Sequence, residues 1–322
     1  MLVCSDTAVA AVLDLAELLD VVEDAFAKQG HGAVTRPERP HFPVGQNEAG
    51  EDPAGTGLAM PAYIHGADHY ATKLVGVHEG NVDRDLPTVQ AQLVLTRADT
   101  GEPAALLAGE RITNARTGCI GGVAARHLAP GDGPVTLGVI GAGTQARWQT
   151  CAVDAAVGVD GVRVYAPSDS RQRCAADFRD RGLAAEAVGR PAAAVADADV
   201  VVTATTATEP VFPGEALSPG TLVVAVGAYD ESMRELDAET VARADALYGD
   251  VPAEVAATGD FPTREVEAFT PLSAAVLGDV TRTRDSEVTV VGSVGSATLD
   301  AAVGEHVYER LCERSMGTEL SL

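Results

Sequence analysis

The stretch YATKLVGVHEGN contains Lys73, one of only two lysines in a chain of 322 residues. The other is Lys28, and every other basic side chain is an arginine. Lys73 stands in an alternating apolar segment that is typical of a strand. A lysine in such a place can lose its hydration, lower its pKa and transfer a proton, which an arginine cannot do. The alternative is a structural lysine whose stem covers apolar surface, as we expect for Lys28.

A second chemical pattern is GVIGAGTQA, a G-x-G-x-x-A sequence between an apolar strand and a helix. Gly141 permits the tight turn, Gly143 lets the backbone approach a pyrophosphate, and Ala146 keeps the helix close to the strand. The N-terminus of the helix adds N–H donors and a positive dipole. The pattern predicts a dinucleotide site that comprises Gly141, Ala142, Gly143, Thr144, Gln145 and Ala146.

The segment VRVYAPSDSRQR, after the next strand, bears on which dinucleotide binds. An NAD site usually has Asp or Glu at the end of this strand, where it binds the ribose 2′-hydroxyl. Here that position is Ala166, so a 2′-phosphate is not repelled, and Ser168 with Arg171 could hydrogen-bond it. The segment favours NADP as the cofactor. NAD remains the alternative, with Asp169 serving the ribose.

Charge and composition exclude several classes of partner. The 47 acidic residues against 23 basic ones give a net charge of -24, which repels nucleic acid and anionic membrane surfaces. Such an acidic surface is also typical of a halophilic protein, since salt screens its self-repulsion. The alternative explanation is a GC-rich genome, although that alone does not account for the acid excess. We predict no nucleic-acid partner, no membrane partner and a halophilic protein.

The cysteines and the N-terminus bear on location. The five cysteines are widely spaced without a paired framework, which is typical of reduced thiols in the cytosol. The N-terminus carries acids early and no positive leader region, and no apolar run approaches the ~20 residues of a membrane span. His65 and His69 are four apart, but Gly66 and an extended context make a metal pair improbable. The sequence predicts a cytoplasmic protein without a bound metal.

The elements that position these residues form two regions. An amphipathic helix at 14–32 is followed by a Pro/Gly-rich stretch and by short alternating strands up to the glycine at 109. A helix and a Pro/Gly linker lead to alternating strands and helices from 135 onward, the pattern of a doubly wound parallel sheet. We predict an α/β protein whose Rossmann-type domain, 130–295, is inserted in a β-rich α+β domain made of 1–129 plus 296–322.

Several segments of the chain also follow one another in a recognisable order, namely RPERP, ATKLVGVHEGN, LPTVQAQLVLTRADTGEPAALLAGERITNARTG, GVIGAGTQARWQ, DVVVTAT, MRELD and GSVGSATLD. In order and spacing they resemble the ornithine cyclodeaminase/mu-crystallin family over nearly the whole chain. The resemblance implies a dimer that forms through the β-rich domain. It also implies hydride transfer between C4 of a nicotinamide and the α-carbon of an amino or imino acid.

By the same resemblance, Arg39, Lys73 and Arg116 look like the cations that hold the substrate carboxylate. A bidentate arginine suits a planar carboxylate, and a lysine adds a point charge that can give up a proton. Thr203 and Thr205 would line the nicotinamide ribose. Ser293 would border the nicotinamide.

Two positions depart from the family pattern. Where relatives have an aspartate in a G-A-D context, this chain has Tyr229, and Asp230 follows one step later. Either Asp230 takes over as the base, or Tyr229 only shapes the pocket. Where ornithine cyclodeaminase has a glutamate just before its M-P, this chain has Leu58. Both polar anchors for ornithine are therefore absent from their expected positions.

Reduction of an imine that is already formed needs only a hydride, a carboxylate clamp and one proton donor. The sequence therefore predicts an NADP-preferring, homodimeric oxidoreductase that acts on a C–N bond and reduces a small ketimine or cyclic imino acid of the pyrroline- or piperideine-2-carboxylate type. The alternatives are an alanine or other amino-acid dehydrogenase that uses Asp230, and an ornithine cyclodeaminase. The non-enzyme alternative is a small-molecule binding protein like mu-crystallin.

Overall fold

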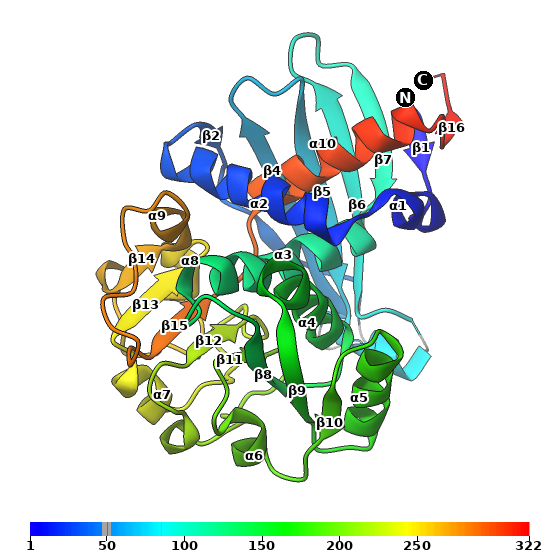
Figure 1. The fold of residues 1–322 in the computed structure, drawn as a ribbon. Coiled ribbons are helices and arrows are strands. Elements are labelled where there is room, and N and C mark those ends of the chain that lie inside the picture. The colour runs from blue at the N-terminus through cyan, green and yellow to red at the C-terminus, as the bar shows by residue number, and fades with distance from the viewer. Residues whose placement is uncertain (47–49, 51–52, 85, 322) are drawn as a thin grey trace. The chain divides into compact units, whose positions relative to one another are not determined.

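The computed structural model describes residues 1–46, 50, 53–84 and 86–321. The chain forms two compact units, each built from separate segments (Figure 1). Unit 1 comprises Met1–Asp14, His31–Arg116 and Ala297–Leu322, and unit 2 comprises Leu15–Gly30 and Thr117–Ser296. The α/β fold that the sequence predicts is confirmed, with a parallel sheet in unit 2 and a mixed sheet in unit 1.

The predicted domain boundaries differ from this division in the segments 15–30 and 117–129 and at Ser296, all of which the structure assigns to unit 2. Helix α2 (Leu15–Gly30) buries Leu18, Leu19 and Val22 and packs against α4 (Thr144–Val157). Helix α3 (Gly109–Leu128) contains the boundary between the units. In its second half, which belongs to unit 2, a Cβ on Gly122 would lie 2.7 Å from a carbonyl oxygen of α4, so this half packs closely against α4.

Unit 1 is built on a sheet in the strand order β16-β1-β7-β6-β5-β4-β2, with β3 paired to β4. The pairs are antiparallel except β1 with β7. Its elements are β1 (Leu2–Cys4), α1 (Asp6–Val12), β2 (Val34–Thr35), β3 (His41–Val44), β4 (Gly55–Ile64), β5 (His69–Val77), η1 (Glu79–Arg84), β6 (Val89–Arg97), β7 (Pro103–Ala108), the first half of α3, α10 (Ala297–Glu313) and β16 (Thr318–Glu319).

Helix α10 covers one face of this sheet and lies across β4, β5, β6 and β7 (Figure 1). Side chains alternate between the faces of a strand, so the odd-numbered residues of β5 and β6 point toward α10. Leu93 and Leu95 are buried there. A Cβ on Gly304 of α10 would lie only 2.2 Å from Cδ2 of Leu93. Glycine at 304 therefore allows the helix to lie close to the sheet.

The opposite face of the sheet carries exposed apolar side chains. Leu74 on β5 is 46% exposed, and Tyr70 on the same strand and Phe42 on β3 are also exposed. Leu74 lies between Ala59 on β4 and Gln92 on β6. We call this surface the open sheet face.

Unit 2 contains an eight-stranded sheet in the order β10-β9-β8-β11-β12-β15-β13-β14, with every pair parallel. Besides α2, the second half of α3 and α4, its elements are β8 (Val135–Ile140), β9 (Val159–Tyr165), α5 (Ser170–Asp180), β10 (Ala185–Ala187), α6 (Pro191–Val195), β11 (Val200–Thr203), η2 (Gly214–Ala216), β12 (Leu222–Ala225), α7 (Ala238–Arg243), β13 (Ala246–Gly249), α8 (Pro252–Val255), η3 (Val266–Ala268), β14 (Phe269–Pro271), α9 (Leu272–Val276) and β15 (Thr289–Gly292).

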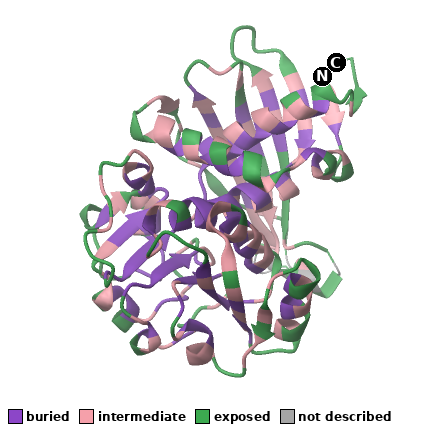
Figure 2. Cartoon of the chain, viewed as in Figure 1, coloured by how far each residue is buried: buried purple, intermediate pink, exposed green. Residues whose placement is uncertain are grey.

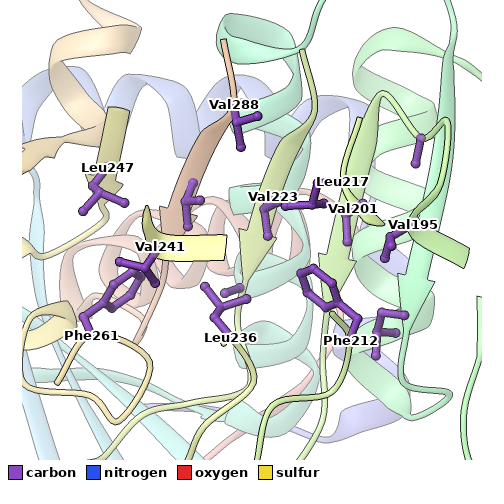
Figure 3. Packing of buried hydrophobic residues seen from close by; sticks show 14 of the residues in the cluster. Val195, Val201, Phe212, Leu217, Val223, Leu236, Val241, Leu247, Phe261 and Val288 are labelled. Carbon is purple, nitrogen blue, oxygen red and sulfur yellow. The ribbon is translucent and has the colours of Figure 1, made fainter. Parts of the chain in front are cut away.

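The central strands of unit 2 read as nearly continuous valine runs, and both faces of these strands are buried (Figure 2). Val201 and Val223 contribute to one apolar cluster with Phe212 and Leu236 (Figure 3). Val290 of β15 belongs to the same cluster. This packing fixes the carboxyl ends of the strands, where ligands bind in open α/β sheets. No helix in the described ranges has the length and apolar character that a membrane crossing requires.

Candidate active site

Lys73 lies in the middle of β5, on the face that α10 covers. Its strand neighbours are Met60 on β4 and Leu93 on β6, and its side chain is only 2% exposed. The Nζ atom lies 2.6 Å from Oδ2 of Asp300. Lys28, by contrast, forms a surface pair with Asp24 within α2 and is 44% exposed. The two lysines of the chain are therefore in opposite environments.

Asp300 joins Lys73 to Arg116. It lies in the first turn of α10, one turn before Gly304, and its side chain is completely buried. Nε of Arg116, on α3, donates to Oδ1 of Asp300 at 2.9 Å. One carboxylate thus carries a lysine on one oxygen and an arginine on the other. We call these three residues the buried triad.

The charged groups of the buried triad shift the pKa values of Lys73 and Asp300. Burial lowers the pKa of Lys73 to about 8; the negative charge of Asp300 opposes this shift, and Arg116 and Arg39 add to it. Burial alone would raise the pKa of Asp300, but the attraction of Arg116 and Lys73 outweighs it and holds that pKa below its usual range. Lys73 can therefore exchange a proton near neutral pH while Asp300 remains a carboxylate.

The triad has an excess of positive charge. Two cations share one carboxylate, and Nη1 of Arg116 is buried without a hydrogen-bond partner among the described residues. A buried guanidinium nitrogen normally has an acceptor. Arg39 is half-buried and acts on Lys73 through its charge. Arg39, Lys73 and Arg116, which the sequence links only by motif, are therefore electrostatically coupled, and an organic carboxylate is a suitable ligand for this group.

Sequence reasoning missed Asp300, although a signal was present. Asp300 shares a helix face with Val303, Gly304 and Val307, at the i, i+3, i+4 and i+7 spacing of an apolar stripe. An acid on the buried stripe of a helix needs a cation beside it. That signal indicates an inward-facing carboxylate but does not identify its partner. Arg116 is 184 residues away in the sequence.

The glycine-rich turn in unit 2 has the features of a pyrophosphate site. Gly141 has φ +112°, and a Cβ there would lie 2.4 Å from the carbonyl oxygen of Ala204. Gly143 is the N-cap of α4, and the position of its missing Cβ faces open space. Ala146 is fully buried against the sheet. Thr144 and Gln145 occupy the first turn of α4. The open space at Gly143 and the helix N-terminus suit the pyrophosphate of a dinucleotide.

Arg147 supports this turn from its carbonyl side. It donates to the carbonyl oxygens of Ala142 at 2.7 Å and Gly143 at 3.1 Å, and it also pairs with Asp177 of α5. At the end of β9, Ala166 is buried and Ser168 is exposed. Nη1 of Arg171 donates to the carbonyl oxygens of Ala166 and Ser168, both at 2.9 Å. Arg171, in the first turn of α5, therefore lies beside the loop that contains Ser168.

The remaining predicted residues of unit 2 lie at the carboxyl ends of the central strands or in the loops after them. Thr203 is fully buried and donates to Glu235, while the N–H of Thr205 donates to the same carboxylate. Ser293 donates to the buried Asp250 at 2.7 Å. Oδ1 of Asp230 accepts hydrogen bonds from Ser232 and Met233 and so holds its own loop. The hydroxyls of Thr203 and Ser293 are thus used within the protein.

Comparison with known proteins gives a match over most of the chain. Residues 1–315 match the model of the ornithine cyclodeaminase/mu-crystallin family. A Δ1-pyrroline-2-carboxylate reductase of Bacillus cereus is 34% identical over 278 residues, which cover 82% of this chain and 84% of that protein.

Two solved structures have the same fold over the full length. The Δ1-pyrroline-2-carboxylate reductase of Thermococcus litoralis, in complex with NADH and L-proline, superposes with a TM-score of 0.92 at 31% identity and covers 99% of this chain and 100% of its own. An archaeal alanine dehydrogenase dimer with bound NAD superposes with a TM-score of 0.92 at 28% identity and covers 100% of this chain and 99% of its own.

Proposed function

Because the chain belongs to the ornithine cyclodeaminase/mu-crystallin family, we propose that it reduces a small ketimine or cyclic imino acid of the pyrroline- or piperideine-2-carboxylate type. The chain is an NAD(P)-dependent oxidoreductase of the class that acts on CH–NH bonds. The observation that carries the proposal is the buried triad. It combines an unsatisfied guanidinium nitrogen, which suits a carboxylate, with a lysine that can donate a proton near neutral pH.

In this proposal the residues of unit 1 bind and protonate the substrate. Arg116 and Arg39 hold the carboxylate, since an arginine fork matches a planar anion. Lys73, in its ammonium form, donates a proton to the imine nitrogen, which makes the adjacent carbon a better hydride acceptor. Asp300 keeps Nζ of Lys73 in one place and compensates part of its charge. Asp300 is therefore a positioning residue that acts through Lys73.

Residues 141–146 would hold the pyrophosphate of the cofactor. When bound, NAD(P)H supplies the hydride. Support for NADPH comes from the absence of an acid at Ala166, from Ser168 in the loop after β9 and from Arg171 in the first turn of α5. The two related structures carry NADH and NAD, so NADH is the alternative donor, with Asp169 at the ribose. We propose NADPH as the preferred donor, and a higher kcat/KM with NADH would contradict it.

Amino-acid dehydrogenation is the second candidate, because the chain is similar to the archaeal alanine dehydrogenase. That reaction would use Asp230 as a base. In the structure, Oδ1 of Asp230 already accepts three hydrogen bonds from its own loop, which favours a structural role. Ornithine cyclisation has less support. Leu58 lies on β4 opposite Val75, and an apolar side chain there offers no anchor for a second amine.

We further propose a cytoplasmic homodimer in which the open sheet face packs against a second copy. Leu74, Tyr70 and Phe42 leave apolar surface uncovered on this face. Large apolar side chains that stay exposed on one face of a sheet favour an interaction site there. The similar alanine dehydrogenase is a dimer, which favours a second copy as the occupant over an unrelated partner.

The test is a substrate panel assayed with both reduced cofactors. Pyrroline-2-carboxylate and piperideine-2-carboxylate are offered in parallel with pyruvate plus ammonia and with ornithine. The proposal predicts oxidation of NADPH with one of the two cyclic imines. Turnover confined to pyruvate plus ammonia would establish the dehydrogenase, and ammonia release from ornithine without net change in cofactor would establish the cyclodeaminase. Cofactor binding without any turnover would indicate a binding protein.

A further inference from the structure

Glu235 is a buried acid of unit 2 that the proposed reaction does not use. It lies in the MRELD segment, after β12, and its side chain is completely buried. Its carboxylate accepts three hydrogen bonds: from Oγ1 of Thr203 at 2.7 Å, from the N–H of Thr205 at 2.6 Å and from the N–H of Gly227 at 2.8 Å. These three partners are all donors, so the geometry suits an ionised carboxylate.

These donors lie at or just after the carboxyl ends of two neighbouring strands. Thr203 ends β11 and Thr205 follows it, while Gly227 follows β12, and β11 pairs with β12 in the sheet. One carboxylate therefore connects the two loops at the carboxyl edge of the sheet. The connection is close, because a Cβ on Gly227 would lie 2.3 Å from the carbonyl oxygen of Thr205 and 2.5 Å from Cδ of Glu235.

The carboxyl edge of a doubly wound sheet is where a dinucleotide binds. β8, which carries the glycine-rich turn, pairs with β11 on its other side, so the loops after β11 and β12 follow the pyrophosphate turn in strand order. We propose that Glu235 positions these two loops for the nicotinamide half of the cofactor, and that this half binds more tightly when Glu235 is ionised. The inference rests on the dinucleotide site proposed above.

The surroundings of Glu235 place its ionisation near neutral pH. Burial raises the pKa of Glu235 to about 7; the nearby Asp260 adds to the shift, and the donors from Thr203, Thr205 and Gly227 oppose it. Asp260 itself accepts the N–H groups of Glu235 and Leu236, and Arg234 acts on Asp260 through its charge. Protonation of Glu235 removes one acceptor position from the three donors. The loops are therefore best held above neutral pH.

The test compares wild-type protein with E235Q in binding titrations with NADH, and with ADP, which carries only the adenine half and the pyrophosphate. At pH 8 we expect E235Q to bind NADH about threefold to tenfold more weakly, the effect of about one lost hydrogen bond, and to bind ADP like wild type. Wild type should bind NADH more weakly at pH 6 than at pH 8, and E235Q should lose this difference. Any protonation of NADH itself between pH 6 and pH 8 affects both proteins equally. A pH dependence of NADH affinity that is present in wild type and absent in E235Q therefore comes from Glu235.

D199N is the matched control. Asp199 also accepts a backbone N–H, from Thr136 at 2.7 Å, but it precedes β11 at the opposite edge of the sheet. D199N should bind NADH like wild type at both pH values. Equal weakening of NADH binding in D199N and E235Q would overturn the inference, because it would reflect general loosening of unit 2.

A second variant covers the case in which E235Q does not fold. T203V removes the hydroxyl that donates to Glu235 while it keeps the side-chain shape, and it should weaken NADH binding and leave ADP binding unchanged. Wild-type NADH affinity in T203V and E235Q, or in T203V alone where E235Q is unfolded, would overturn the inference and leave the proposed function intact. Failure of wild type to bind NADH, NADPH or ADP would overturn the proposed dinucleotide site as well.

Discussion

At the scale of single residues, the chemistry depends on how a lysine and an arginine share one buried carboxylate. Removing one member of a buried ion pair leaves an uncompensated charge, which costs about 3–5 kcal/mol. Here two cations depend on Asp300, and Arg116 retains a buried nitrogen without a partner in the described part of the chain. We infer that a bound substrate carboxylate supplies the missing negative charge. The site is therefore less strained electrostatically with substrate than without it.

The pH dependence of reduction should report on Asp300. Reduction needs Lys73 in its protonated form, so kcat/KM should fall as the pH rises above about 8, where the ammonium loses its proton. The charge of Asp300 raises the pKa of Lys73, so D300N lowers it. We expect the alkaline limb of kcat/KM in D300N to move to lower pH by about 1 to 3 units.

D6N serves as the control for this profile. Asp6 forms an exposed pair with Arg111 in the same unit, at 2.7 Å, without contact to the triad. Its profile should match wild type. An alkaline limb that stays in place in folded D300N would contradict the assigned role of Asp300.

At the scale of elements, local pattern predicted most of the fold. The strand, turn and helix at 135–157 could be predicted because the apolar run, the glycines and the helical spacing are contiguous. The unit to which helix 15–30 belongs could not be predicted, because the sequence does not show which unit its apolar stripe packs against. Its place in unit 2 follows from its packing against α4 and α9.

The same distinction holds for the candidate site. The glycine-rich turn was predictable because its function depends on adjacent residues. Asp300 and Glu235 were not predicted, because each works through partners that the fold brings from other strands or helices. The motif alone also could not show that the hydroxyl of Thr203 is used by Glu235.

The open sheet face predicts the oligomeric state. Leu74 points away from α10, since it alternates with Lys73 on β5. A charge at this position would have to be buried in the proposed dimer, so L74E should shift the protein to a monomer in light scattering after size-exclusion chromatography. V266E, at an exposed site in unit 2, is the control and should leave the mass unchanged. A dimer of unchanged stability in L74E would show that the open sheet face is not the dimer interface.

At the scale of the whole molecule, charge should dominate the response to salt. A net charge of -24 destabilises the compact state through self-repulsion, and salt on the order of 1 M reduces the Debye length to about 3 Å. We propose that the protein is adapted to high salt. Its Tm should rise with KCl from low concentration to the order of 1 M. A Tm that is constant or falls over this range would contradict the proposal.

The central claim is that the buried triad protonates an imine whose carboxylate it also binds. The most direct measurement is turnover of pyrroline- or piperideine-2-carboxylate with NADPH by K73A, beside K28A as the surface-lysine control. We expect K73A to keep the fold and the affinity for NADPH and to lose about a hundredfold or more in kcat, while K28A behaves like wild type. Turnover by K73A close to that of wild type would contradict the account.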